Sequence, residues 1–375
     1  MPLKKVVSDQ RSAISRRGKR RRVEEEKGSE RDSASLFSRP AVAPTPRSVS
    51  SKRASSKRGA ASGRSTTPRR QSVVIVGAGR LGTALARALA ACGYDVRALV
   101  ARSDASARRG AARACVKARA LGVARLEELP PSDFLFISTP DDAIEETAQR
   151  VAALPDARAR IALHTSGALS SEVLTPLRAR GYAVGSMHPL VAVTEAEAGA
   201  ESLSRAFYCV EGDARAVRAA RRLVRDLGGR SFSISAGDKA LYHAAALIAA
   251  GHAVALFDTA AGLLARCGLS DGEARRVLLP LLASTLENLS RSPPERALTG
   301  TFARGDASTV RKHLAALGGS GDAEALLVYA LLGARSLRLA ARRGVADASA
   351  LKEIAMLLAS ATVNRAQDPE PSAGK

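Results

Sequence analysis

The sequence is poor in aromatic residues and in cysteine, and both shortages narrow what the protein can do. Only 3% of the 375 residues are aromatic, so the chain lacks the interleaved aromatic side chains on which unpaired bases stack. The four cysteines, Cys92, Cys115, Cys209 and Cys267, are widely spaced and form no pair with the spacing of a metal or redox motif. This usage fits reduced thiols in the cytosol and indicates no metal site.

Long uncharged apolar runs are also missing. No secretory hydrophobic segment is found. The longest candidate run, 244–256, contains His252 and falls short of the roughly 20 residues that a membrane span needs. We therefore expect a cytoplasmic protein with no membrane partner.

Positive charge is abundant but unevenly placed. Residues 1–70 hold 20 Lys and Arg against 6 Asp and Glu, so they carry +14 of the formal net charge of +22. This segment is rich in Ser, Arg and Pro, which is typical of a disordered basic tail. The tail is a candidate for non-specific binding of nucleic acid. The alternative is a solvated extension, including translated upstream sequence from a misplaced start.

Short apolar runs alternate with helical patterns from residue 71 to residue 235, which predicts a mostly parallel α/β sheet covered by helices on both sides. The expected strands are 72–77, 95–100, 114–118, 133–138, 160–164, 182–187, 206–211 and 230–234, with helices including 81–92, 141–153 and 213–227. From 236 to 360 the chain is rich in Ala and Leu at helical spacing. We therefore expect a second, all-α domain there, followed by a disordered end at 361–375.

The most informative stretch follows the first expected strand and reads VVIVGAGRLG from Val73. Strand, glycine turn and helix in this order are typical of a dinucleotide site in a Rossmann-type domain. The first glycine permits the tight turn, the second a close approach of the pyrophosphate, and the third the packing of a helix whose first amides face the anion. The residues expected to contact the cofactor here are Gly77, Gly79, Arg80, Leu81 and Gly82. An ordinary tight strand-to-helix turn is the alternative.

The end of the second expected strand indicates which dinucleotide binds. It reads Ala101-Arg102-Ser103 and lacks the carboxylate with which NAD enzymes hold the ribose 2′-hydroxyl. Arg102 offers a planar fork for a 2′-phosphate, and Ser103 can donate a hydrogen bond to it while capping the next helix. NADP is therefore the expected cofactor and NAD the less favoured one. The alternative is a solvated arginine beside a helix cap.

A rigid polar loop follows the fourth expected strand. In this fold, ligands lie across the carboxyl ends of the strands, so Thr139 and Pro140 are expected to border the nicotinamide ribose. As an alternative, this loop only starts a helix that Asp141 caps.

Two of the five histidines also stand at neighbouring strand ends. His164 is followed by Thr165, Ser166 and Gly167, and His188 is followed by a proline. A histidine and hydroxyls beside a glycine form a compact set of donors and acceptors. We expect His164, Ser166 and His188 to orient a substrate, although either histidine alone is more often a satisfied structural residue.

The opening turn of the helical domain carries Lys239 and His243. At spacing i, i+4 they share one face of a helix and can present an ammonium and an imidazole to one substrate carbonyl. Lys239 is the expected proton-transfer residue, which requires a pKa lowered by burial or nearby positive charge. An exposed lysine at a helix start is the alternative.

A further loop, 299–306, joins two expected helices and is rich in glycine and charge. Arg304 can grip a substrate carboxylate. Equally, Asp306 can simply cap the next helix.

Together these motifs resemble a bacterial family of Rossmann-like proteins that carry the helical domain of unknown function 2520. The resemblance covers about residues 71–360. It rests on Gly77 to Gly82, Ala101-Arg102-Ser103, Thr139-Pro140-Asp141, His164-Thr165-Ser166-Gly167, His188-Pro189-Leu190, Lys239 with Tyr242-His243, and Thr299-Gly300 with Arg304-Gly305-Asp306.

This family is similar to pyrroline-5-carboxylate reductase, prephenate dehydrogenase and the β-hydroxyacid dehydrogenases. In the last group an asparagine follows the active-site lysine by four residues. Here Lys239 fits the first position but His243 replaces the asparagine, which departs from hydroxyacid chemistry. The resemblance implies a reductase-like fold, an NADP-type cofactor and a homodimer through the helical domain.

These observations favour an NADP-dependent oxidoreductase that transfers a hydride to or from a small keto, imino or hydroxy acid. In such an enzyme the cofactor supplies the hydride chemistry, and the protein supplies position and charge. A dinucleotide-binding sensor or scaffold without turnover is the alternative.

Overall fold

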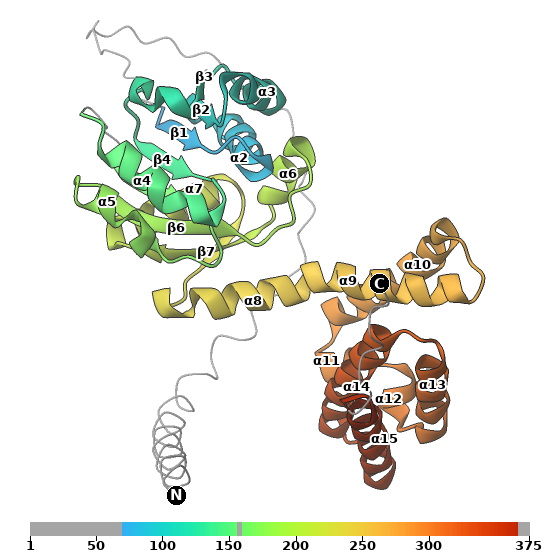
Figure 1. The fold of residues 1–375 in the computed structure, drawn as a ribbon. Coiled ribbons are helices and arrows are strands. Elements are labelled where there is room, and N and C mark those ends of the chain that lie inside the picture. The colour runs from blue at the N-terminus through green and yellow to red at the C-terminus, as the bar shows by residue number, and fades with distance from the viewer. Residues whose placement is uncertain (1–69, 156–159, 367–375) are drawn as a thin grey trace, which may run out of the picture. The chain divides into compact units, whose positions relative to one another are not determined.

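The computed structural model describes residues 70–155 and 160–366 (Figure 1). The expected basic tail, apart from residue 70, and the last part of the expected disordered end, 367–375, lie outside the described residues.

One sheet organises the first domain, in the order β3-β2-β1-β4-β5-β6-β7-β8. Its strands are β1 (Ser72–Val76), β2 (Asp95–Ala101), β3 (Arg119–Gly122), β4 (Phe134–Ile137), β5 (Ile161–His164), β6 (Ala183–Pro189), β7 (Phe207–Gly212) and β8 (Arg230–Phe232). Neighbouring strands are parallel except β6 and β7, which are antiparallel. The Rossmann-type, mostly parallel sheet predicted from the sequence is confirmed.

Helices cover both faces of this sheet (Figure 1). Strand β1 is buried on both sides because its alternate residues enter two separate cores: Val73 and Ile75 join one, Val74 and Val76 the other. The first core is closed by α2 (Arg80–Ala91), α3 (Asp104–Ala114), α6 (Ala196–Leu203) and α7 (Ala214–Asp226). The second is closed mainly by α4 (Ile144–Ala152) and α5 (Thr175–Arg178). This double burial explains why the strand reads as a continuous apolar run.

The strand expected at 114–118 is wrong. Helix α3 continues to Ala114 and ends at Cys115, whose φ of 56° is left-handed. The apolar residues Val116 and Ala118, which suggested a strand, pack against the core from the connection instead. Strand β3 follows at Arg119–Gly122.

Three short helical turns lie between elements of the first domain: η1 (Val123–Glu128), η2 (Asp141–Ala143) and η3 (Ser171–Leu174). A fourth, η4 (Ala236–Asp238), follows β8, and the rest of the described chain is helical, as predicted. Its helices are α8 (Lys239–Ala249), α9 (Gly251–Arg266), α10 (Asp271–Arg291), α11 (Pro294–Ala297), α12 (Gly300–Arg304), α13 (Ala307–Gly319), α14 (Ala323–Arg343) and α15 (Ala348–Ala366). Helix α15 runs beyond residue 360, where a disordered end was expected. The loop expected at 299–306 contains the short helix α12.

Helices α8, α9 and α10 carry many large apolar side chains on their surface. These are Leu241, Leu247, Ile248, Val254, Leu256, Val277, Leu279, Leu281, Leu286 and Leu289. By length and composition, one described segment, Ala236–Arg266, would suffice to cross a membrane, with a mean hydropathy of 1.6 over its most apolar stretch. Between Lys239 and Asp258 this segment contains no Asp, Glu, Lys or Arg, so its uncharged stretch, 240–257, is longer than the run 244–256 taken from the sequence.

Candidate functional site

The glycine turn after β1 is shaped by three different constraints. Gly77 has a φ of +116°, and a Cβ there would lie 2.4 Å from the backbone carbonyl of Ser138. A Cβ on Gly82 would lie 1.9 Å from the Gly77 oxygen, so this glycine lets α2 pack on the turn. At Gly79, by contrast, a Cβ would meet nothing within 4 Å. The backbone at Gly79 therefore borders open space, where a ligand can approach it closely.

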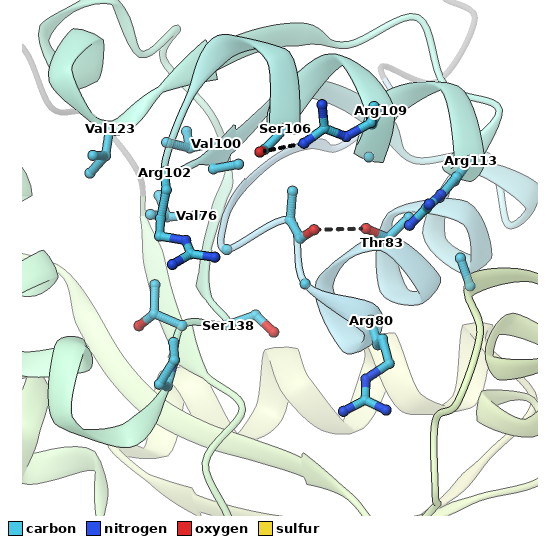
Figure 2. Close-up of a pocket in the computed structure, with 18 of the residues that line it drawn as sticks. Val76, Arg80, Thr83, Val100, Arg102, Ser106, Arg109, Arg113, Val123 and Ser138 are labelled. Carbon is cyan, nitrogen blue, oxygen red and sulfur yellow. Dashed lines mark hydrogen bonds between the residues drawn. The ribbon is translucent and has the colours of Figure 1, made fainter.

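That open space belongs to a cleft of about 1410 Å³ across the ends of β1, β2 and β4 (Figure 2). Of the residues expected to contact a cofactor, those that line it are Gly77, Gly79, Arg80, Arg102, Thr139 and Pro140. Leu81 packs against the hydrophobic core instead, and Gly82 is buried. The cleft follows the rule that ligands of open α/β sheets lie at the carboxyl ends of the strands.

Positive charge gathers at the β2 side of the cleft. Figure 2 shows Arg102 at the end of β2, with Ser106 and Arg109 nearby on α3. Arg109 Nη2 donates to Ser106 Oγ over 2.9 Å. Arg102 makes no hydrogen bond or ion pair within the part of the chain that the structure describes. A free guanidinium beside a hydroxyl and a second guanidinium fits a phosphate group.

Ser103 has a different place from the one expected. Its Oγ accepts from Ser106 N over 3.3 Å and so caps α3, and it also donates to Ser106 Oγ over 3.1 Å. Ser103 does not line the cleft, whereas Ser106 does. The cap was predicted, but the hydroxyl that faces the cleft belongs to Ser106. Ser106 and Arg109 were missed because only a structure shows that the first turns of α3 face this space.

A dinucleotide fits these residues on two observations of the structure. The turn at Gly79 leaves room for a pyrophosphate at the N-terminus of α2, where helix amides favour an anion. Among the described residues, the side-chain oxygen that is buried without a partner is Thr139 Oγ1, and Thr139 lines the same cleft. A buried hydroxyl without a hydrogen bond is costly, and a ribose hydroxyl is a suitable partner.

Polar contacts continue from the cleft to the end of β5. Thr165 Oγ1 donates to Ser138 Oγ over 3.1 Å, and Ser166 Oγ donates to Asp141 Oδ2 over 2.8 Å. Asp141, offered as a helix cap by the sequence, makes no capping hydrogen bond and holds Ser166 instead. Ser166 Oγ also accepts the amides of Ala168 and Leu169. Ser166 is therefore a fixed residue of the loop after β5.

His164 is fully buried, and both nitrogens of its ring are occupied by this same loop. Nδ1 accepts the amide of Ser166 over 3.2 Å, and Nε2 lies 3.1 Å from the carbonyl oxygen of Ser170. A neutral ring with the proton on Nε2 satisfies both contacts. Burial, and then the charge of Lys239, lower the pKa of His164 to about 3. The geometry makes His164 a residue that shapes the loop rather than one that offers a free nitrogen to a substrate.

Lys239, the first residue of α8, is only 1% exposed. Its Nζ donates to the carbonyl oxygen of Ser166 over 3.1 Å and to Ser186 Oγ on β6 over 2.8 Å. Neither partner is charged, and burial lowers the pKa of the ammonium. The reading of Lys239 as an exposed helix start is wrong. A buried ammonium with two neutral partners keeps one N–H for a ligand.

Three rings surround the space near Lys239. His188, on β6, and Tyr242, on α8, are joined by a hydrogen bond of 2.7 Å between Nδ1 and the phenol oxygen. The ring of His243 packs edge-on against His188, with centroids 5.7 Å apart. A Cβ on Gly167 would lie 2.5 Å from His243 and 2.9 Å from His188, so this glycine leaves room for both rings. Burial lowers the pKa of His188 to about 4, so its ring is neutral near pH 7.

The structure thus brings together most of the residues expected to act on a substrate. Ser166, His188, Lys239 and His243 form one cluster beside the loop that borders the cleft. Arg304 is not among them: it is exposed on α12, and no described hydrogen bond or ring contact joins it to Lys239. The neighbouring Asp306 caps α13 by accepting the amide of Thr309.

Fold and cleft define a class: a Rossmann-type domain with a dinucleotide-sized cleft, followed by a helical domain. Residues 57–189 match the family described as Rossmann-like domain, and residues 206–336 match Domain of unknown function (DUF2520). Both domains named by the resemblance are therefore present in this chain. A comparison with curated proteins finds no match.

Solved structures are similar over most of the chain. A "putative NADP oxidoreductase BF3122" from Bacteroides fragilis is 23% identical, with 70% of this chain and 96% of that chain covered and a TM-score of 0.57. Protein TM1727 from Thermotoga maritima is 22% identical, with 79% and 100% covered and a TM-score of 0.54. A Plasmodium falciparum pyrroline carboxylate reductase with NADP bound is 11% identical, with 78% and 97% covered and a TM-score of 0.44. At these identities, the first two structures show a shared fold.

Proposed function

We propose that the protein is an NADP-dependent oxidoreductase that exchanges a hydride with a small keto, imino or hydroxy acid. The observation that carries this proposal is the buried Lys239. It is hydrogen-bonded to the loop after β5, and Thr165 of that loop donates to Ser138 at the dinucleotide-sized cleft. A protein that only senses a dinucleotide has no need of an ammonium buried beside the cleft, because burying a charge costs stability. A buried ammonium that lowers stability is expected where its charge has a catalytic role.

Lys239 is suited to proton transfer at the substrate. When bound, the nicotinamide supplies or receives the hydride at the substrate carbon. In the reductive direction, Lys239 Nζ gives a proton to the carbonyl or imine atom that gains the electron pair, and in the oxidative direction the neutral amine takes it back. Burial lowers the pKa of Lys239, so the ammonium releases its proton more readily than an exposed lysine does. Ser166 O and Ser186 Oγ hold the nitrogen in place.

The hydrogen bonds of the Lys239 ammonium favour an acidic substrate. Both partners of Nζ among the described residues are neutral, and the carboxylates of Glu211 and Asp141 act on the ammonium only by longer-range attraction. A substrate carboxylate, or the negative charge that develops on a carbonyl oxygen during reduction, is an anion that the remaining N–H can contact directly.

The preference for NADP is attributed to Arg102 and to the Ser106–Arg109 pair. Each is positioned at the cleft beside the end of β2, where this fold binds the adenosine ribose. Replacing Arg102 by alanine removes charge-assisted hydrogen bonds worth about 1.5–3 kcal/mol, which corresponds to roughly 10- to 150-fold weaker binding of NADPH. The affinity of Arg102→Ala for NADH, which has no 2′-phosphate, is expected to stay within about twofold of that of the intact protein.

The experiment compares NADPH and NADH titrations of the intact protein, Arg102→Ala and Arg108→Ala. Arg108 is an exposed neighbour on α3 that does not line the cleft, so its variant is the matched control. Turnover is then measured by incubating the protein with NADPH and a metabolite extract, and following the consumed acid by mass spectrometry. Lys239→Ala should keep its NADPH affinity and lose turnover. Equal affinity of the intact protein for both dinucleotides would refute the NADP assignment, and absence of any consumed metabolite would favour the sensor.

We also propose that the protein forms a homodimer through its helical domain. The exposed apolar side chains of α8, α9 and α10 support this proposal, because soluble monomers rarely expose large continuous apolar surfaces.

A further inference from the structure

Tyr242 is enclosed by the residues of the candidate site. The ammonium of Lys239 lies 5.7 Å from the centroid of its ring. Phe232 and His188 both meet the ring edge-on, with centroids 5.9 and 5.7 Å away. These contacts leave the phenol in one position, with its oxygen 2.7 Å from His188 Nδ1. The sequence contained Tyr242 within a motif but gave it no role.

The direction of the hydrogen bond between the phenol and His188 decides the tautomer of the imidazole. Burial raises the pKa of Tyr242, so the phenol keeps its proton, and the ring of His188 is neutral near pH 7. A protonated phenol that donates to Nδ1 leaves the imidazole proton on Nε2. The titratable groups around this pair are Lys239 and His243 on α8, Cys209 on β7 and His164 on β5.

His188 Nε2 is the free end of this pair. It makes no hydrogen bond within the part of the chain that the structure describes. It lies beside Gly167, where a Cβ would approach it to 2.9 Å, so the absence of a side chain at Gly167 keeps this side of the ring open. When the phenol donates to Nδ1, the N–H at Nε2 and the third N–H of Lys239 are both free donors. Two donors in one cluster suit an oxygen that only accepts, such as a carboxylate or carbonyl oxygen.

We propose that Tyr242 is a positioning residue that holds His188 in the Nε2–H tautomer, so that Nε2–H donates a hydrogen bond to a carboxylate or carbonyl oxygen of the substrate. This inference rests on the proposed function for the identity of the acceptor. The hydrogen bond from Tyr242 to His188 is a property of the free protein and is testable without a substrate.

The first test reads the tautomer directly by nitrogen-15 NMR of the histidine side chains in the full chain. His188→Gln identifies the His188 signals by their loss. The intact protein should show a protonated Nε2 and an unprotonated Nδ1 at His188. Tyr242→Phe keeps the ring and its packing but lacks the hydroxyl, and should give signals averaged between the two tautomers. Unchanged His188 signals in Tyr242→Phe would overturn the inference.

The chain offers a matched control in a second tyrosine–histidine pair. Tyr329 OH lies 2.9 Å from His313 Nδ1, and the two rings meet edge-on at 5.7 Å. They belong to α14 and α13, and no described hydrogen bond or ring contact joins them to the residues around Lys239. Tyr329→Phe should change the signals of His313 and leave those of His188 unaltered.

The second test uses turnover of the metabolite found with NADPH. Loss of one positioned hydrogen bond predicts a roughly three- to tenfold lower kcat/KM in Tyr242→Phe, with unchanged NADPH affinity and no loss in Tyr329→Phe. An unaltered kcat/KM would overturn the substrate contact. If the tautomer responds as expected but the intact protein has no turnover, the proposed function fails while the tyrosine–histidine pairing stands.

Discussion

The three glycines in the turn after β1 differ in what an added methyl group would meet. Substitutions in this turn therefore test stability and cofactor binding separately. Gly77 has a positive φ and no room beside Ser138, whereas Gly79 faces open space. We expect Gly77→Ala to lower the free energy of unfolding by at least about 2 kcal/mol through backbone strain and overlap. Gly79→Ala should unfold like the intact protein but bind NADPH more weakly, because its methyl group enters the space proposed for the pyrophosphate.

Urea denaturation and NADPH titration of the two variants measure these effects independently. If Gly79→Ala binds NADPH as tightly as the intact protein, the pyrophosphate lies elsewhere. A stability of Gly77→Ala equal to that of the intact protein would contradict the steric argument.

The residue types in the sequence predicted the location of the site better than the role of each residue in it. Glycines, a proline and histidines at strand ends are visible in sequence because each has a strong backbone or chemical preference. Partners are not visible, since Asp141 holds Ser166 from another strand end, and Ser186, which binds Lys239, is one of many serines. Whether a histidine has a free nitrogen also depends on folded neighbours: His164 has none, whereas His188 does.

At the scale of elements, the ends of β5 and β6 each hold a histidine in its neutral form, and this predicts acid sensitivity. The pKa of His164 is lowered from 6.5 to about 3, and that of His188 to about 4. Because the unfolded chain binds these protons at higher pH than the folded chain, the stabilising effect is complete above about pH 6.5. It is lost progressively as the pH falls from 6.5 towards the folded values. Between pH 7 and pH 5, linkage gives a loss of about 2 kcal/mol for each histidine.

Urea denaturation at pH 7 and pH 5 measures this loss. His164→Asn retains an acceptor near the position of Nδ1 but has no proton to gain in this range. Its stability should therefore change with pH by about 2 kcal/mol less than that of the intact protein. The same pH dependence in both proteins would mean that His164 is not buried in its neutral form.

The order and type of the elements were predictable, but one strand was not. Strands β1 and β4 are buried on both faces, so their apolar runs are unambiguous. The connection after α3 has the same apolar character over a few residues because Val116 and Ala118 pack on the core without pairing. Hydrophobicity reports burial, whereas strand pairing also needs a free sheet edge, and here that edge is reached only at Arg119.

At the scale of the whole molecule, the apolar surface of α8, α9 and α10 requires an explanation that a single chain does not supply. The same helix that carries Lys239 and Tyr242 on one face exposes Leu241 and Ile248 on another. Polar residues such as His252 and Asp258 interrupt the apolar surface of α9, and the surface continues onto α10, which carries Arg275 and Arg276. A second copy of the chain suits this mixed surface better than the interior of a bilayer, where charged side chains are costly.

The homodimer proposal predicts that one charge on this surface will dissociate the protein. Val254 on α9 is 71% exposed, and Val345, after α14, is 73% exposed. They make a matched pair, because glutamate at either position is equally accessible in the single chain. Size-exclusion chromatography with light scattering should show a dimer for the intact protein and for Val345→Glu. Val254→Glu should be a monomer at the same concentration, since burying an unpaired carboxylate in an apolar interface costs several kcal/mol. A monomeric intact protein that sediments with lipid vesicles would contradict the proposal and assign the surface of Ala236–Arg266 to a membrane.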